Sequence, residues 1–329
     1  MLMDLIEWEE GKDGTAQPLP LAFAKAAGPL LPALGDCTFL FAGRPPMAPG
    51  YWLAGGLLRN GLSVSGAGES LGASLGALCG EASELALFSD WRHARSADSS
   101  ADAPDWYLSS AGLGAGWDLA SAVTHGALEL IERQVVLDWW QHGGIVRTIE
   151  PPGPTWAKAL FGRTQERRCD LLLLGEPGPA VTVMAVSFKP NGFGFCFGAA
   201  ARADLTTAIR SAAKELLQSE FGLELAQSKL ERHGEEKLGN HDRLAIHHAA
   251  SLHRSAILDE AVATIEIDDQ QFATTRLDLS AAFQWRDLGR YRSCLLVAKV
   301  AKAPLEILKY AAAPTATKAL THRSTIPLY

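Results

Sequence analysis

"HGALELIERQVVLDWW", residues 125–140, reads as a helix that is apolar on nearly every side. Glu129, Glu132 and Arg133 nevertheless stand in the middle of it. Burying a carboxylate without a partner is costly. A helix of this kind therefore needs something that accepts its two acids, which lie three residues apart.

Two other predicted helices share this arrangement. Each helix begins after a Ser or Asp cap that follows a loop containing Gly or small residues. The three segments are "SLGASLGALCGEASE" from Ser70, "DLASAVTHGALELIE" from Asp118 and "DLTTAIRSAAKELLQ" from Asp204. Glu or Gln stands eleven and fourteen residues after each cap, as Glu81 and Glu84, Glu129 and Glu132, and Glu215 and Gln218.

Residues three apart on a helix differ by roughly 60° of rotation, so each pair projects from one face. If the three helices come together, their carboxylates repel, at about 4 kcal/mol for two charges about 4 Å apart and an effective dielectric near 20. A bound cation removes this repulsion. Carboxylate oxygens without His or Cys suit Mg²⁺, which often brings substrate phosphates with it.

Two alternatives to a magnesium site remain at this point. A di-iron helical bundle also uses carboxylates three residues apart, but it normally requires Glu-x-x-His, and no pair here ends in His. A single Glu-x-x-Glu is also common on solvated helices, where it has only a structural role. The repetition at one offset from three caps favours a shared functional site.

The composition limits the class of protein. The 329 residues are 47% apolar and 20% charged, as in an ordinary globular protein with a sizeable core. The net charge of −7 argues against a nucleic-acid partner. The acidic N-terminus lacks a signal-peptide pattern, and no apolar run reaches transmembrane length, so we expect no membrane association. Five scattered cysteines without a CxxC pair indicate a reduced, cytoplasmic protein.

Strands alternate with these helices, so the predicted class is α/β with α+β mixing. The first sixty residues, rich in Pro and Gly, are interpreted as short strands and loops. Apolar, β-branched runs predict further strands. These runs are "RCDLLLLG" (168–175), "AVTVMAVSF" (180–188), "GFGFCFGAAA" (192–201), "DEAVATIEI" (259–267) and "RSCLLVAKV" (292–300).

The acidic helices and the turns before them resemble the motifs of the YcaO family. The matching stretches are "SGAGESLGASLGALCGEASE" (65–84), "SSAGLGAGWDLASAVTHGALELIERQVVLDWW" (109–140) and "FCFGAAARADLTTAIRSAAKELLQSE" (195–220). The resemblance implies a YcaO-like α/β fold with these helices packed on mixed sheets around a nucleotide site. It implies one domain over residues 1–329, with N-terminal strands and loops in 1–60, the best-matching core in 61–221 and a C-terminal subdomain in 222–329.

The resemblance also implies the site. ATP and Mg²⁺ are its expected cofactors, and no separate catalytic side chain is expected. The implied metal ligands are Glu81, Glu84, Glu129, Glu132 and Glu215, all of them also cofactor-binding, with Gln218 at the nucleotide and Arg133 on phosphate. Arg suits that role because its fixed fork of donors matches phosphate oxygens.

The implied activity is ATP-dependent activation of backbone amides in a ribosomally made peptide, with azoline formation by cyclodehydration as the leading product. Thioamide or amidine formation by the same chemistry is the alternative. The expected partners are a precursor peptide and a separate peptide-recognition protein, and a homodimer fits the family.

Three positions depart from the family pattern. Ala67 replaces a common Lys, Ala77 a common Ser and Ala111 a common Asn. These changes favour a second hypothesis of a different class, a degenerate subunit that binds a partner without catalysis.

Several other residues are expected to be structural. The irregular spacing of His241, His247, His248 and His253 predicts a polar loop or helix surface. His125 lies one turn before Glu129 and is expected in or beside the core, with a hydrogen bond at the site as the alternative. Buried packing is expected of Cys79, Cys196, Trp139 and Trp140.

Overall fold

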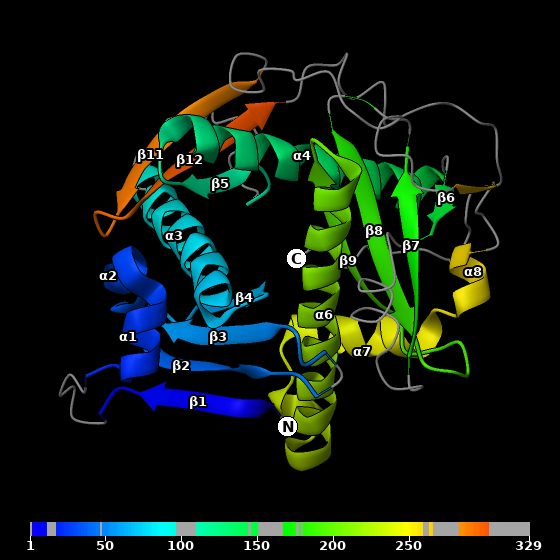
Figure 1. Cartoon of the computed structure of the whole chain (residues 1–329), viewed down its shortest axis with the longest axis horizontal. Coiled ribbons are helices and arrows are strands. Elements are labelled where there is room, and N and C mark those ends of the chain that lie inside the picture. Colours follow the sequence, from blue (N-terminus) through cyan, green and yellow to red (C-terminus); the bar gives the residue numbers. More distant parts are fainter. Residues whose placement is uncertain are drawn as a thin grey trace. The chain divides into compact units, whose positions relative to one another are not determined.

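The computed structural model of the chain is drawn in Figure 1. It describes residues 2–11, 18–46, 48–96, 110–143, 146–150, 167–175, 178, 180–258, 263–265 and 283–302. The chain divides into two compact units. The first comprises Met1–Leu130 with Asp278–Pro304, and the second Ile131–Leu277 with Leu305–Tyr329. The division reflects contact density, so the single domain expected over residues 1–329 stays a prediction.

The first unit contains two antiparallel sheets and a helix that packs against both. The four-stranded sheet has the order β1-β2-β3-β4, and the three-stranded sheet has the order β11-β12-β5. Helix α3 (Leu71–Ser96) contacts strands of both sheets and buries Leu75, Leu78 and Ala82 against them. The strands are β1 (Met3–Glu9), β2 (Cys37–Arg44), β3 (Trp52–Leu58), β4 (Ser63–Gly68), β5 (Leu113–Gly116), β11 (Gln284–Tyr291) and β12 (Leu295–Lys302).

The first sixty residues include helices, which corrects the expectation of strands and loops alone. Helix α1 (Leu21–Ala27), the 3-10 turn η1 (Gly28–Leu30) and helix α2 (Leu31–Leu34) lie between β1 and β2. Leu, Ala and Lys are good helix formers, and Phe23 and Ala27, four residues apart, are both buried. Pro29 and Pro32 stand at the starts of η1 and α2, where a missing N–H does no harm.

The second unit is built on one five-stranded sheet of order β10-β6-β7-β8-β9. Helix α6 (Leu205–His233) packs on β8 and β9, and α7 (Asn240–Ser251) packs on α6 (Figure 1). Helix α4 (Leu119–His142) runs from the first unit into the second. The remaining elements are β6 (Val146–Ile149), β7 (Arg168–Leu174), β8 (Val181–Phe188), β9 (Cys196–Arg202), η3 (Glu235–Lys237), α8 (Arg254–Leu258) and β10 (Ala263–Ile265).

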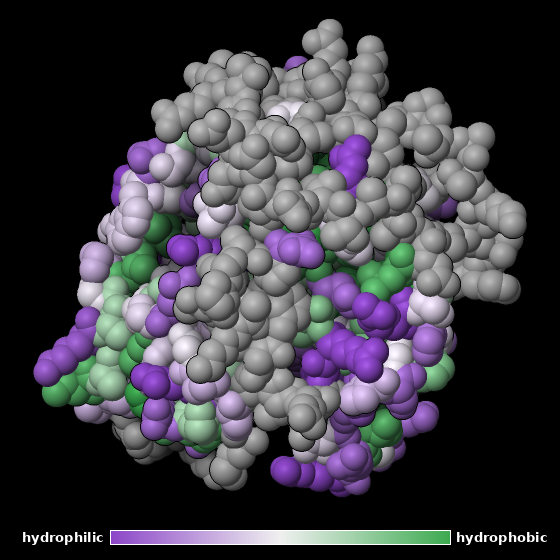
Figure 2. Space-filling view, turned by 45° about the vertical axis from the view of Figure 1, so that its right-hand side comes forward, coloured by the Kyte–Doolittle hydropathy of each residue, from purple (hydrophilic) through white to green (hydrophobic). Residues whose placement is uncertain are grey.

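Helices and antiparallel sheets are thus mixed along the chain, which confirms the predicted α/β class. Strands β7 and β8 fall within the predicted runs, and β9 and β12 begin within theirs and end one and two residues beyond them. Of the run 259–267, residues 263–265 form β10, and its other residues lie outside the described part of the chain. Where the chain is described, Figure 2 shows hydrophilic side chains interspersed with hydrophobic ones on the face in view.

Helix α3 corrects one expectation. Its segment Leu71–His93 is long and apolar enough to cross a membrane by length and composition, although the sequence was expected to hold no such run. The same segment buries Leu75 and Cys79 in the core of the first unit. Its apolar character is that of a core helix.

Candidate functional site

All three predicted caps are present. The side chains of Ser70, Asp118 and Asp204 each accept a hydrogen bond from the backbone N–H three residues later. The distances are 3.1 Å to Ala73, 2.7 Å to Ser121 and 2.8 Å to Thr207. Each cap satisfies a donor that the helix itself leaves unpaired. The three acidic helices therefore start at equivalent positions.

Each acidic helix follows a strand at the edge of a sheet. Strand β4 leads into α3, β5 into α4 and β9 into α6, and all three strands are the last in their sheets. An edge strand has N–H groups that no neighbouring strand can pair. These groups must find another acceptor or face water.

The first acid of each helix supplies an acceptor for an N–H in that strand or, at β5, in the turn directly before it. Oε2 of Glu81 accepts a hydrogen bond from the Ser65 N–H at 2.6 Å. Glu129 accepts one from the Gly112 N–H at 2.9 Å, and Glu215 one from Ala199 at 3.3 Å. The donors precede the acids by 16, 17 and 16 residues. The repeat seen in the sequence is therefore a repeat of strand, cap and carboxylate in three dimensions.

Close packing of helix on strand makes these hydrogen bonds geometrically possible. A Cβ added to Gly66 would lie 2.3 Å from the Ser74 carbonyl oxygen. A Cβ on Gly114 would lie 2.1 Å from the Ala122 carbonyl oxygen. Only glycine lets the backbones approach so closely.

The acids of α3 and α4 meet at β5. Glu84 Oε1 accepts a hydrogen bond from the Ala115 N–H at 2.7 Å, three residues along from the Gly112 N–H that Glu129 binds. His125 Nδ1 lies 2.7 Å from the carbonyl oxygen of Ala115. A carbonyl only accepts, so Nδ1 carries the proton. His125 is exposed on α4, not in the core, and its hydrogen bond is to the β5 backbone; a role at a nucleotide site stays a prediction.

Burial dominates the electrostatics of the first acid. It raises the pKa of Glu81 above its ordinary value, and the two donors of Ser65 only partly offset this. The cap Asp118 is affected in the opposite sense, because hydrogen bonds from the Ser121 backbone and hydroxyl lower its pKa. A nearby cation would favour the charged form of Glu81 and so offset the effect of burial.

The other predicted residues lie on α4 and α6. Glu132 and Arg133 are half-buried on the part of α4 that belongs to the second unit. Gln218 is half-buried one turn after the exposed Glu215 on α6. Among the residues that the structure describes, no three His, Cys, Asp or Glu side chains form a group that could hold a metal ion. The metal and nucleotide roles of these residues stay predictions.

The donor chemistry at β4 and β5 fits Mg²⁺. Glu81 at β4 and Glu84 and Glu129 at β5 offer only carboxylate oxygen, which this ion prefers. A carboxylate has about four lone-pair sites. An acid that accepts an N–H bond is thus oriented by the strand and keeps capacity for a cation.

The cysteines behave as the sequence predicted. Burial raises the pKa of Cys37, Cys79 and Cys196 to about 12, which keeps these thiols protonated. A protonated thiol is a poor nucleophile. Trp139 and Trp140 are also buried, as expected.

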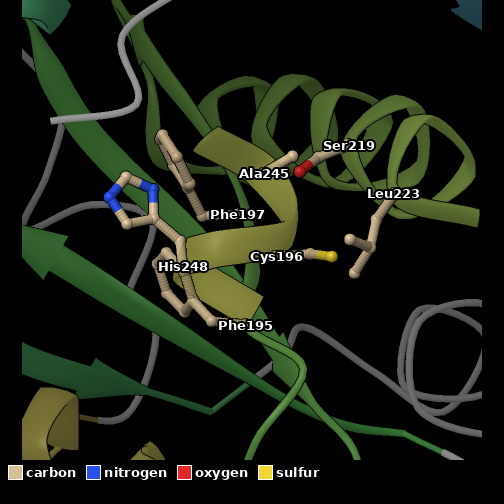
Figure 3. A pocket seen from close by; sticks show the side chains of 7 residues that line it. All are labelled: Phe195, Cys196, Phe197, Ser219, Leu223, Ala245 and His248. Atoms are coloured by element: carbon tan, nitrogen blue, oxygen red, sulfur yellow. The ribbon is translucent and has the colours of Figure 1, made fainter. Parts of the chain in front are cut away.

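One histidine departs from the surface expectation. His248 on α7 is buried. Its ring packs edge-on against that of Trp140, with 6.1 Å between the ring centroids. It lines a small recess of the second unit between β9, α6 and α7 (Figure 3). The other lining residues are Phe195, Cys196, Phe197, Ser219, Leu223 and Ala245. The spacing of the histidines could not reveal this burial, because it depends on how α7 packs on the sheet.

Sequence reasoning also missed Lys299 on β12. This lysine is 1% exposed, and its ammonium donates a hydrogen bond to the carbonyl of Ala111, beside the Gly112 N–H that binds Glu129. The available signal was a lone Lys in the apolar run "CLLVAKV".

Solved structures of low sequence identity share the fold. The YcaO protein of Methanopyrus kandleri bound with AMPPCP and Mg²⁺ is 17% identical with a TM-score of 0.56, covering 84% of this chain and 88% of that chain. A chain of the E. coli microcin synthetase McbBCD complex with pro-MccB17 bound is 14% identical with a TM-score of 0.58, covering 80% and 87%. A heterocyclase in complex with substrate and cofactor is 17% identical with a TM-score of 0.55, covering 76% of this chain and 47% of that chain.

No curated protein sequence matches the chain. A profile of the family described as YcaO cyclodehydratase, ATP- and Mg²⁺-binding, matches residues 89–288, more than half of the chain. The acids of α4 and α6 lie inside that range, and those of α3 immediately precede it. The chain belongs to the YcaO family.

Proposed function

We propose that this protein uses ATP and Mg²⁺ to activate backbone amides of a ribosomally made peptide, and that the product is an azoline formed by cyclodehydration. The observation that carries the proposal is the threefold repeat of edge strand, capped helix and anchored carboxylate. A purely structural Glu-x-x-Glu has no reason to recur with its donor 16 or 17 residues before it in three separate sheets.

The residues of this chain would bind and orient the cofactor. The five acids that the family resemblance implies, Glu81, Glu84, Glu129, Glu132 and Glu215, would be the Mg²⁺ ligands. Gln218 would bind the nucleotide, and Arg133 would contact phosphate. When bound, ATP supplies the phosphoryl group that makes the amide oxygen a leaving group. Positioning and charge neutralisation are then the main tasks of the protein.

The reaction also requires a nucleophile, and the peptide carries it. In azoline formation the side chain of the following Cys, Ser or Thr adds to the amide carbon, and the amide oxygen departs as phosphate. The chain's own buried thiols, with pKa values of about 12 at Cys79 and Cys196, are not suited to that role.

The expected partners follow from the same chemistry. We propose a precursor peptide as substrate and a separate recognition protein that delivers it, and the E. coli neighbour, a synthetase complex with pro-MccB17 bound, supports this. We also propose a cytoplasmic location, supported by the free cysteines.

A subunit that binds a partner without catalysis is the second candidate. It is favoured by Ala67, Ala77 and Ala111, which supply no polar side chain where the family commonly has one. Ala67 is buried in β4.

Nucleotide binding is the first test, because the proposed enzyme requires it. Mg²⁺ with ADP at millimolar concentration should raise the melting temperature, because a ligand that binds only the folded state stabilises it by mass action. Glu132→Ala should abolish this rise without unfolding the protein. The matched control is Glu231→Ala, an exposed carboxylate on α6, which should leave the rise unchanged. If the melting temperature of the wild-type protein does not rise, the proposed enzymatic function is contradicted.

The product is identified by mass after incubation with the precursor peptide and ATP. Loss of water indicates azoline formation, and replacement of oxygen by sulfur indicates a thioamide. An unchanged peptide in the presence of clear nucleotide binding would favour the second candidate.

A further inference from the structure

Lys299 is a buried cation in the first unit. It lies on β12 opposite Leu113 of β5, and its side chain is 1% exposed. The ammonium donates a hydrogen bond to the Ala111 carbonyl and lies 5.6 Å from the ring centroid of Phe88. Burying an ammonium is costly unless its surroundings favour the charge. A methionine would fill similar space without that cost.

The two contacts of Lys299 are each one step from an acid of a different helix. Phe88 follows Glu84 on α3 by four residues, one helical turn on the same face. Ala111 precedes Gly112, whose N–H binds Glu129 of α4. Lys299 thus binds the same peptide unit, between residues 111 and 112, that binds Glu129.

The turn at residues 111–112 is bound to β12 through two consecutive backbone carbonyls. Lys299 binds the carbonyl of Ala111, and the N–H of Val300 donates to the carbonyl of Gly112 at 2.7 Å. Gly112 has φ +80°, and a Cβ there would lie 2.6 Å from the Val300 carbonyl oxygen. Two consecutive residues of β12 thus set the direction in which the Gly112 N–H points. That direction fixes the Glu129 carboxylate.

We propose that Lys299 is a positioning residue of the acidic site. It anchors the 111–112 turn and offsets the charge of Glu84 and Glu129, so that both acids are oriented before Mg²⁺-nucleotide arrives. The inference rests on the proposed nucleotide binding. It also gives position 111 a role that Ala can perform, because the anchor takes the main-chain carbonyl rather than a side chain.

The experiment measures the Kd of Mg²⁺-ADP by calorimetry for the whole chain and three variants of Lys299. Lys299→Met, close in volume but uncharged, should raise the Kd at least tenfold. Lys299→Gln keeps a donor for the Ala111 carbonyl but loses the charge, and should raise it at least threefold. Lys299→Arg keeps both and should stay within about threefold of the wild type. Arg286→Met is the matched control, because Arg286 pairs with Lys299 across the β11–β12 ladder but is exposed.

A double-mutant cycle separates positioning from general stability. If Lys299 acts through Glu129, the effects of Lys299→Met and Glu129→Gln on the Kd should be clearly less than additive. A purely structural lysine would lower the melting temperature and leave the Kd unchanged, which overturns the inference, as does strict additivity. Should Lys299→Met fail to fold, Lys299→Gln carries the test, and a wild-type Kd in that variant overturns the inference. If the wild type binds no nucleotide, the proposed function itself is contradicted.

Discussion

The strand–helix pair β4–α3 and the pair β9–α6 share one topology but hold their first acid differently. Glu81 is half-buried and accepts from both the N–H and the hydroxyl of Ser65, at 2.6 and 3.4 Å. Glu215 is exposed and accepts from Ala199 at 3.3 Å. The backbone hydrogen bond to Glu81 is thus shorter than the one to Glu215, and Glu81 also accepts from a hydroxyl.

The sequence around the two strands accounts for this difference. Strand β4 carries glycines at 66 and 68, both close to the backbone of the first turns of α3, and Ser65 supplies a hydroxyl to Glu81. Strand β9 has a single such glycine, Gly198, followed by alanines, which supply no hydroxyl. Burial fixes the orientation of a carboxylate, but it also raises the free energy of its charged form. Equal spacing from the cap therefore does not give Glu81 and Glu215 equal burial or equal hydrogen bonds.

The close approach that both pairs share gives the largest expected effect. Gly66→Ala and Gly198→Ala should each destabilise the protein by about 1–3 kcal/mol, because the new Cβ would lie 2.3 Å from the Ser74 oxygen or 2.2 Å from the Leu216 nitrogen, both backbone atoms. Gly222→Ala, on the same helix as Leu216 with nothing within 4 Å, should instead stabilise by up to about 1 kcal/mol. Urea unfolding measures all three. A Gly198→Ala variant as stable as Gly222→Ala would show that α6 can move away from β9.

Substitutions at the caps of α3 and α6 compare how much each cap contributes to the free energy of unfolding. Ser70→Ala and Asp204→Ala should each cost about 1 kcal/mol, since each removes the acceptor for one N–H. The loss at Asp204 should be the larger in low salt, because its charge also favours the helix N-terminus, by about 0.3–1 kcal/mol. Repeating the melts in high salt should bring the two losses together. Ser70→Thr is the control and should be nearly neutral. A loss at Ser70 that exceeds the loss at Asp204 in low salt would contradict the assignment.

Much of this arrangement is local and was therefore predictable. A cap and an acid eleven residues later belong to one helix, so Asp204 and Glu215 could be placed from spacing alone. The partner of the acid could not, because the Ala199 N–H is unpaired only when β9 lies at a sheet edge, and sheet order is a long-range property. Lys299 was missed for the same reason, since 188 residues separate it from Ala111. Helix α1 was missed because prolines at helix starts resemble loop signals.

The smallest expected effect isolates the charge of the first acid. Because burial raises the pKa of Glu81 from its ordinary value of 4.5, the folded state favours the protonated form, and the stability that this provides is lost as the pH rises through the folded-state pKa. Glu81→Gln keeps an acceptor for the Ser65 N–H and removes the charge. The variant should match the wild type near pH 4 and melt a few degrees higher near pH 7.

Glu215→Gln provides the comparison, because the exposed carboxylate stays hydrated and its replacement should change the melting temperature little at either pH. Scanning both variants from about pH 4 to 7.5 measures the difference. Glu81→Gln should also weaken Mg²⁺-ADP binding, since a neutral amide is a poorer ligand for a hard cation. A variant that is more stable yet binds less well is the expected result for an acid kept for function at a cost in stability. A Glu81→Gln variant that is less stable at every pH would mean that the carboxylate serves mainly to hold the edge of β4.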